Sequence, residues 1–361
     1  MKKALIVLLS LAVAGGLFAQ SFSGGVSSGL LLGFDEDGHS FYTSKSDGGD
    51  QYGYYFNWGW TGESGRVGGG INAAGSNGEG WNFDGSNLWF KPLDILTLKG
   101  GGGGLGGFGT PGAVDASNDA ADQGVGLSLK LEPIAGLALG AGVEPKALEI
   151  GKALYTFGAS YTLTNLVGVV ANVRLNPETV DDDGVTTDSS VNAAAGVNVL
   201  ALSNIAGLTI GVDVAAENVA NLSDAGKVTA GAKIGFKVAD LGATLLGKVL
   251  LPMTDAQKDI GLNALIGADL SYPIGAITAN LNVGYLLNGV TDAGRKFNPG
   301  RWEAMPFDFI ETDSSALSIN PSISFKVSEA SLNVGYGLKT NVGGDVSKLN
   351  HEIYTGVEIG F

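Results

Sequence analysis

The most regular feature of this chain is an alternation of apolar and polar residues that recurs from about residue 123 to the C-terminus. Residues 208–215 read LTIGVDVA, so that Leu, Ile or Val fills every second position. Successive side chains of a strand point to opposite sides, and a period of two therefore predicts strands with one apolar and one polar face. A helix would scatter the same residues around its circumference.

The breaks between the alternating stretches also follow a pattern. Very short turns alternate with longer segments that are acidic or rich in Gly and Asn. Transmembrane barrels show this alternation, because they have short turns on one rim and longer loops on the other. We predict 18 strands, with 16 as the nearest alternative; an even number places both termini on the short-turn rim. The predicted strands are 20–34, 50–61, 65–74, 80–90, 93–105, 123–132, 136–144, 152–163, 166–175, 190–200, 207–216, 226–239, 242–251, 259–272, 276–287, 315–327, 331–340 and 350–361.

The predicted fold class is an all-β, antiparallel, up-and-down transmembrane barrel. Beyond the first residues, no apolar stretch approaches the roughly 20 residues that a membrane-spanning helix needs, so insertion would use strands. Glycine is abundant, at 59 of 361 residues, but the chain is 44% hydrophobic and only 16% charged, which argues against disorder. Barrels of about 16 to 18 strands leave an aqueous channel.

The N-terminus predicts export. Met1, Lys2 and Lys3 precede a short apolar run, and a small residue, Ala19, stands before Gln20. A charged start, a short apolar core and a small residue at the cleavage point are typical of a secretory signal peptide. The expected organisation is a signal peptide at 1–19 and a single barrel at 20–361.

The C-terminus carries a resemblance to a known superfamily. Ile353, Val357 and Ile359 belong to an alternating strand, and the chain stops at Phe361. A terminal aromatic residue closing such a strand resembles the assembly signal of bacterial outer-membrane β-barrel proteins, and the size is similar to that of porins, without pointing to a subfamily. The resemblance implies the outer membrane of a diderm bacterium, contact with its lipids, recognition by the barrel assembly machinery, and compatibility with a homo-oligomer.

This resemblance and the strand number together predict a channel for passive diffusion of small hydrophilic solutes or ions. The polar strand faces supply more cations than anions, although the chain carries a formal net charge of −15. The acids are therefore concentrated in loops. A mildly anion-preferring lumen is one hypothesis, and a lumen without net preference is the alternative. The candidate pore-lining residues are Lys130, Arg174, Asp213, Lys227, Lys233, Lys237, Lys248, Asp269, Lys326 and Lys339.

The longest break, residues 288–314, is the predicted constriction loop. Its candidate solute contacts are Arg295, Arg301 and Trp302. A surface loop that packs its own aromatic residues is the alternative. The run at residues 100–104 lacks the Lys-Ser/Thr of a phosphate loop and is interpreted as a flexible or closely packed strand end.

The composition offers few residues for enzymatic or metal chemistry. There is no cysteine, the only histidines are His39 and His351, and neither accompanies a nucleophile motif. The acidic runs at residues 35–37 and 181–183 match no calcium-loop spacing and are interpreted as solvated loop tips. We expect no enzyme activity, cofactor, metal or nucleic-acid partner. The alternatives are a structural or adhesive outer-membrane barrel with acidic surface loops and a soluble all-β protein.

Overall fold

The structure is a computed structural model, and it describes most of the chain. The described residues are 18–35, 38–43, 53–62, 64–76, 82–113, 126–145, 152–180, 186–200, 207–260, 262–287, 315–328, 330–342 and 349–360.

Antiparallel strands dominate these residues. In the N-terminal half they are β1 (Phe18–Asp35), β2 (Gly38–Thr43), β3 (Gly53–Gly62), β4 (Val67–Ser76), β5 (Asn82–Leu93), β6 (Leu96–Gly101), β7 (Gly126–Ile134), β8 (Leu137–Pro145), β9 (Ala153–Leu163) and β10 (Val167–Asn176). The C-terminal half contributes β13 (Ser190–Val199), β14 (Thr209–Glu217), β15 (Lys227–Val238), β16 (Leu241–Leu251), β17 (Asn263–Ile274), β18 (Ile277–Leu287), β19 (Ser315–Val327), β20 (Ala330–Val342) and β21 (Leu349–Gly360).

Small elements occupy the longer connections. A two-stranded hairpin of β11 (Thr179–Val180) and β12 (Thr186–Thr187) follows β10. The 3₁₀ helix η3 (Val219–Asn221) and α2 (Leu222–Ala225) connect β14 to β15, and α3 (Asp255–Ile260) connects β16 to β17. Among the described residues, no helix is long and apolar enough to cross a membrane.

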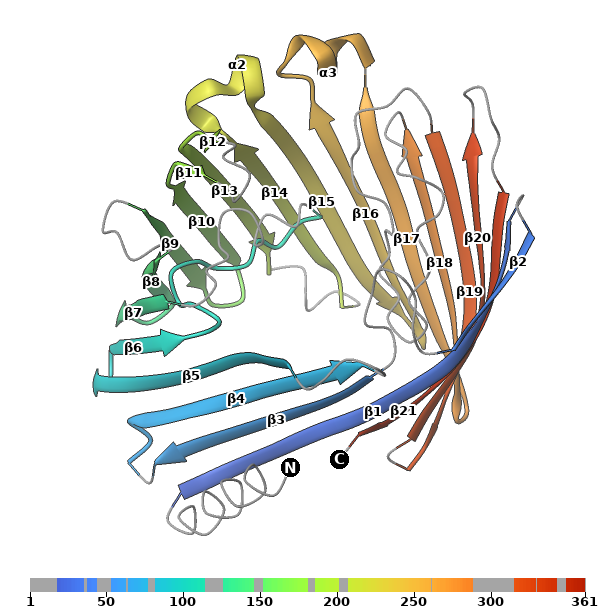
Figure 1. The fold of residues 1–361 in the computed structure, drawn as a ribbon, viewed down its shortest axis with the longest axis horizontal. Helices are drawn as coiled ribbons and strands as arrows, with labels where there is room; N and C mark the ends of the chain where they lie inside the picture. The colour runs from blue at the N-terminus through green and yellow to red at the C-terminus, as the bar shows by residue number, and fades with distance from the viewer. Residues whose placement is uncertain are drawn as a thin grey trace.

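The strand pairings close into a ring (Figure 1). Strands that follow one another along the chain pair side by side, with β10 pairing with β13 across the small hairpin. The ring closes where β1 pairs with β21, from Gly25 opposite Gly360 to Phe34 opposite His351. β2 and β3 both pair with the other side of β1, so they share one interrupted strand position. Within the described residues the ring therefore has 18 strand positions, as the sequence predicts.

The two rims differ in the way that the sequence pattern predicts. Tight turns at residues 94–95, 135–136, 239–240 and 275–276 lie on one rim, together with the start of β1 and the end of β21. Three of these four turns use left-handed backbone, at Gly136 with φ 83°, Ala239 with φ 52° and Gly275 with φ 64°, because this conformation matches the twist of a tight hairpin. The connections on the opposite rim are mostly longer.

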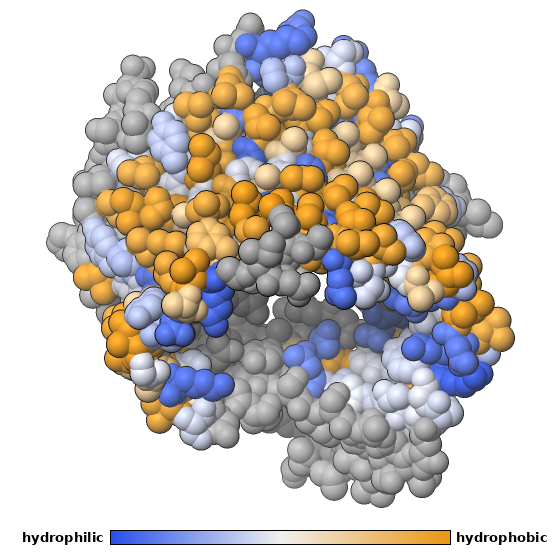
Figure 2. Space-filling view, turned by 180° about the vertical axis from the view of Figure 1, so that it is seen from behind, coloured by the Kyte–Doolittle hydropathy of each residue, from blue (hydrophilic) through white to orange (hydrophobic). Residues whose placement is uncertain are grey.

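An apolar belt covers the outer face of the barrel. The register aligns Val212, Ala232, Gly247, Ile266 and Tyr285 across five neighbouring strands. Large apolar side chains on this face stay exposed, and Ile266 is 65% exposed. Figure 2 shows the belt as a broad orange field over the strands. On a transmembrane barrel such a belt faces hydrocarbon, which explains why so much apolar surface is not buried within the protein.

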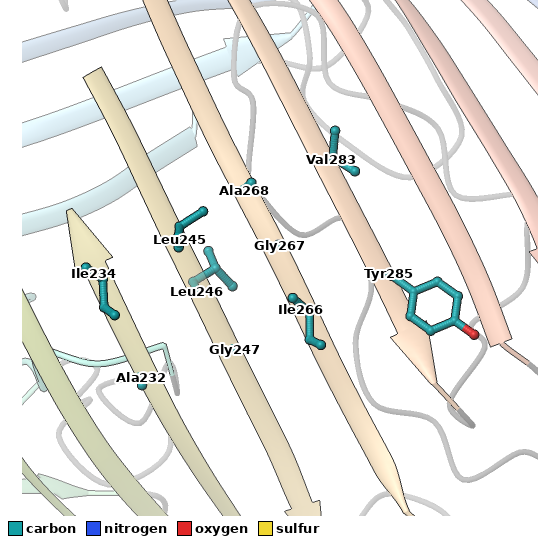
Figure 3. Close-up of a pocket in the computed structure, with 10 residues that line it drawn as sticks. All are labelled: Ala232, Ile234, Leu245, Leu246, Gly247, Ile266, Gly267, Ala268, Val283 and Tyr285. Atoms are coloured by element: carbon teal, nitrogen blue, oxygen red, sulfur yellow. The ribbon is translucent and has the colours of Figure 1, made fainter. Parts of the chain in front are cut away.

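The belt is shallowly hollowed over β15–β18, where small residues lie between large ones (Figure 3). Ala232, Gly247 and Ala268 leave room between Ile234 and Ile266, and the resulting groove has a volume of about 350 Å³. Its wall is almost wholly apolar side chains and glycine, so the groove belongs to the lipid-facing surface.

The inner face is mostly polar among the described residues, but an apolar cluster interrupts it. Leu265, Leu286 and Ala316 pack together on neighbouring strands and are at most 2% exposed, with Leu246 against them. They hold inward register positions in line with Lys248. The alternation in the sequence predicts a polar inner face and gives no sign of this cluster.

A charge placed in the belt should weaken the barrel. We expect Ile266→Lys to lower the free energy of unfolding in lipid vesicles by about 2–4 kcal/mol, because a lysine at mid-bilayer is poorly solvated. Ser324→Lys, on the inner face of β19, should change it by no more than about 0.5 kcal/mol. Denaturant titration of vesicle-inserted protein measures both, and equal losses would show that the assigned faces are wrong.

Candidate solute channel and its inward-folded segment

The register places all ten predicted pore-lining residues on the face opposite the apolar belt. Lys233, Lys237 and Lys326 are exposed on it, whereas Asp213 is only 6% exposed. Lys248 lies opposite Gly231 and Leu265, and Lys339 holds the register position opposite Ser318. This placement is what a pore-lining role requires, and conductance has to test the role itself.

Several of these charges have partners on the same wall. The ammonium of Lys130 lies 2.9 Å from the carboxylate of Glu132, and that of Lys227 lies 3.2 Å from Glu217, its direct neighbour across β14 and β15. Arg174 donates from Nε to the side-chain oxygen of Asn176 at 2.9 Å. The ion pairs are partly exposed, so they contribute little to stability and mainly fix where charge sits along the wall.

The three predicted constriction residues Arg295, Arg301 and Trp302 lie outside the described residues. A different segment, residues 102–113, runs along the inner face of the barrel after β6 (Figure 1). It begins where Gly101 adopts a φ of 101° and the chain leaves the sheet. Lys99 then donates to the carbonyl oxygen of Gly103 at 2.5 Å, which supports the turn. We call residues 102–113 the inner segment.

Side chains of three strands form hydrogen bonds to the inner segment, through its backbone groups and through the hydroxyl of Thr110. On β10, Asn172 accepts from the Phe108 N–H at 2.9 Å and donates to the Phe108 carbonyl oxygen at 2.6 Å. On β14, Asp213 accepts from the Thr110 hydroxyl at 2.8 Å. On β7, Ser128 accepts from the Leu105 N–H at 3.0 Å. Asn172 is only 2% exposed, so both polar ends of its amide depend on this contact.

Four glycines of the wall beneath the inner segment let its backbone approach closely. At Gly158 a Cβ would lie 2.8 Å from a ring carbon of Phe108, and at Gly211 it would collide with the carbonyl oxygen of Pro111. These distances leave no room for a side chain at either position. Because glycine has none, the inner segment can lie flat on the strands. The glycines with this role, one on each of four strands, are Gly140, Gly158, Gly196 and Gly211.

The prediction of a strand over residues 93–105 is therefore wrong at its end. β6 stops at Gly101, where a positive φ turns the chain inward. Only glycine fits this position, because a Cβ would collide with the carbonyl oxygen of Ser86. The sequence did carry a signal for the inner segment. Glycine occupies inward positions on β8, β9, β13 and β14, and a wall without side chains implies that another part of the chain lies against it.

No group of three residues suited to holding a metal ion is found in the described part of the chain. The acidic run at residues 181–183 and most of the run at residues 35–37 lie outside that part. The predicted absence of metal chemistry is left untested by this arrangement.

A closed ring that is apolar outside, mostly polar inside and lined in part by an inner segment has the fold of a porin-like outer-membrane β-barrel. No family model and no curated protein matches the sequence. Solved structures do match, among them OprD/Occ-family outer-membrane porins. OpdL of Pseudomonas aeruginosa has a TM-score of 0.57 at 12% identity, with 95% of this chain and 98% of that chain covered.

Two further structures extend the comparison. OccAB3 of Acinetobacter baumannii has a TM-score of 0.58 at 9% identity, covering 95% of this chain and 99% of that chain. OprD of Pseudomonas aeruginosa has a TM-score of 0.55 at 10% identity, covering 95% of each chain. Identities this low establish a shared fold over nearly the whole length of both proteins.

A methyl group on the glycine wall should push the inner segment into the lumen. We expect Gly211→Ala to lower single-channel conductance, because the new Cβ would occupy the place of the Pro111 carbonyl oxygen at an overpacking cost of about 1–3 kcal/mol. Gly168→Ala is the matched control, since the nearest atoms to its Cβ lie at 3.8 Å. Equal conductance in the two variants would contradict this role of the wall.

Removal of the Asn172 amide should loosen the same segment. In Asn172→Ala the Phe108 N–H and carbonyl oxygen both lose their partner, so we expect amide exchange at Phe108 to become about tenfold faster. Asn198→Ala, on β13, should leave the rate unchanged. NMR-detected exchange in detergent micelles measures both rates, and a protected Phe108 amide in Asn172→Ala would refute the assignment.

Proposed function

We propose that the chain is an outer-membrane channel through which small hydrophilic solutes and ions diffuse passively. The observation that carries the proposal is the closed ring of 18 strand positions with an apolar belt outside and exposed lysines inside. A barrel of this width is too large for its own side chains to fill, so water occupies the remainder. Passage needs only this wetted path, and the proposal includes no enzymatic step.

The inner charges favour anions. Asp213 is engaged by Thr110 of the inner segment, and Glu217 is paired with Lys227. Lys233 and Lys237 stay exposed on the neighbouring strand β15. A small excess of positive charge has an enlarged effect in a passage with low-dielectric walls, because the field is focused there. We therefore propose a mild preference for anions.

The proposal also includes export through a cleaved signal peptide and assembly through the C-terminal strand. A signal peptide cleaved after Ala19 would remove the first two residues of β1, Phe18 and Ala19, which pair with Gly62 and Thr61. These pairs lie at the end of the strand, so the rest of the ring is unaffected. At the other end of the chain, β21 and the following Phe361 would present the recognition signal to the barrel assembly machinery.

Reconstitution of the purified protein into planar lipid bilayers tests the channel. We expect stepwise ionic currents in KCl, and in a salt gradient a zero-current potential of the sign that marks anion preference. A correctly folded barrel without current would favour the structural or adhesive alternative. Clear cation preference would leave the channel standing and overturn the proposed selectivity.

Charge reversal on β15 should shift that potential. We expect Lys233→Glu and Lys237→Glu each to reduce the anion-to-cation permeability ratio by at least about twofold, because a unit charge at about 8 Å in water contributes about 0.5 kcal/mol. Lys258→Glu on α3, outside the ring, is the control and should have a smaller effect. An equal shift in all three variants would place the selectivity outside the lumen.

A further inference from the structure

Three neighbouring strands carry a hydrogen-bonded row of polar side chains on the inner face. Asp269 on β17, Asn282 on β18 and Asn320 on β19 hold adjoining register positions. Asn320 donates from Nδ2 to the Asn282 side-chain oxygen at 3.2 Å, and Asn282 in turn donates from Nδ2 to the Asp269 carboxylate. We call these three residues the Asp-Asn-Asn row.

The carboxylate fixes the direction of the row. An ionised Asp269 can only accept, so Asn282 must turn its NH₂ group toward Asp269 and its oxygen toward Asn320. Asn320 then has to present its own NH₂ group, which also reaches the Ser318 hydroxyl at 2.9 Å. Its side-chain oxygen is left without a hydrogen-bond partner, although the residue is only 1% exposed. A buried acceptor in this state is costly and would be satisfied by a donor from a bound molecule.

The row lines a cavity of about 460 Å³ on the inner wall. Hydroxyl groups of Thr244, Ser271 and Ser322 complete much of the lining, together with Lys237. All of these residues hold inward register positions, so the cavity opens on the lumen side of the sheet and is separate from the outer groove. Its volume lies within the range of small-molecule sites.

We propose that this cavity is a subsite for a neutral polyhydroxylated solute the size of a sugar or sugar alcohol. Vicinal hydroxyls can donate to the Asp269 carboxylate and to the orphan oxygen of Asn320 while accepting from Lys237. The threonine and serine hydroxyls match them because each can donate and accept. The inference rests on the proposed channel function and adds the class of solute.

The groups around the Asp-Asn-Asn row make it a poor binding site for ionic solutes, although Lys233 and Lys237 attract small anions to the lumen. Two lysines of β15 flank the register row of Asp269. Asp269 pairs with Thr244, and Thr244 pairs with Gly235. Lys233 and Lys237 lie two residues before and two residues after Gly235. A cationic solute would meet these two ammonium groups. An anionic group bound at the row would lie against the Asp269 carboxylate and would have no proton to donate to the orphan oxygen of Asn320. A neutral molecule with both donors and acceptors avoids either repulsion, which is how a site gains specificity through unfavourable contacts with competitors.

Single-channel recording with added glucose tests the subsite. We expect a saturable reduction of the KCl current by glucose. Asp269→Asn and Asn320→Ala should each weaken it by about fivefold, as the loss of one hydrogen bond predicts. Asn333→Ala, an inward amide on β20 outside the cavity, is the matched control and should stay within about twofold of the wild type. A normal KCl current shows that each variant has folded.

The outcomes separate the subsite from the channel. Glucose that leaves a normal KCl current unchanged, or variants that respond like Asn333→Ala, would overturn the subsite alone. Equal, saturable block by serine, a zwitterion of similar polarity, would overturn the assignment to neutral polyols. No KCl current in the wild-type barrel would overturn the proposed function and the subsite with it.

Discussion

The closure of the sheet on itself is the constraint on which the rest of this structure depends. A strand edge in hydrocarbon would leave a row of N–H and C=O groups without partners, each at a cost of several kcal/mol. Pairing β1 with β21 removes the only two edges that a meander of neighbouring strands would leave. Once the ring is closed, every wall residue has either a lipid-facing or an inward-facing side chain. The alternation along the sequence follows directly from that division.

The width of the ring creates a second requirement, because an interior too wide for side chains to fill has to be shaped by other means. In this chain the inner segment provides part of that shape, and the wall is adapted to receive it. Four glycines give the segment a flat surface, while Asn172 and Asp213 supply hydrogen bonds at fixed points along it. Part of the high glycine content therefore reflects close backbone contact with the inner segment.

Much of the ring could be predicted from sequence because its signals are local. The predicted strand at residues 315–327 coincides with β19, and the one at 226–239 differs from β15 by a single residue at each end. Lipid on one side and water on the other enforce a strict period of two, and tight turns mark where it stops. The interrupted position of β2 and β3 was predicted only in part, as 50–61, because the interruption obscures the period.

Features that depend on distant residues were not predicted. The inner segment has no periodicity of its own, and its place is set by Asn172 and Asp213, which are far away in sequence. The Asp-Asn-Asn row likewise exists only because the register aligns β17, β18 and β19. The inward cluster of Leu265, Leu286 and Ala316 contradicts the expected polarity, and only the pairing of strands brings these residues together. Loop length and aromatic content pointed instead to residues 288–314, which the structure does not describe.

The seam between β1 and β21 also has a kinetic consequence. It joins Gly25 to Gly360, so the contact that seals the cylinder links residues that are more than 300 positions apart in sequence. Contacts of this kind form slowly, because the entropy of a very long loop must be lost before they form. Until the last strand is in place, the first strand has no partner on that side. The maturing barrel must therefore pass through a stage with two open edges, and its survival depends on how well they are shielded during that interval.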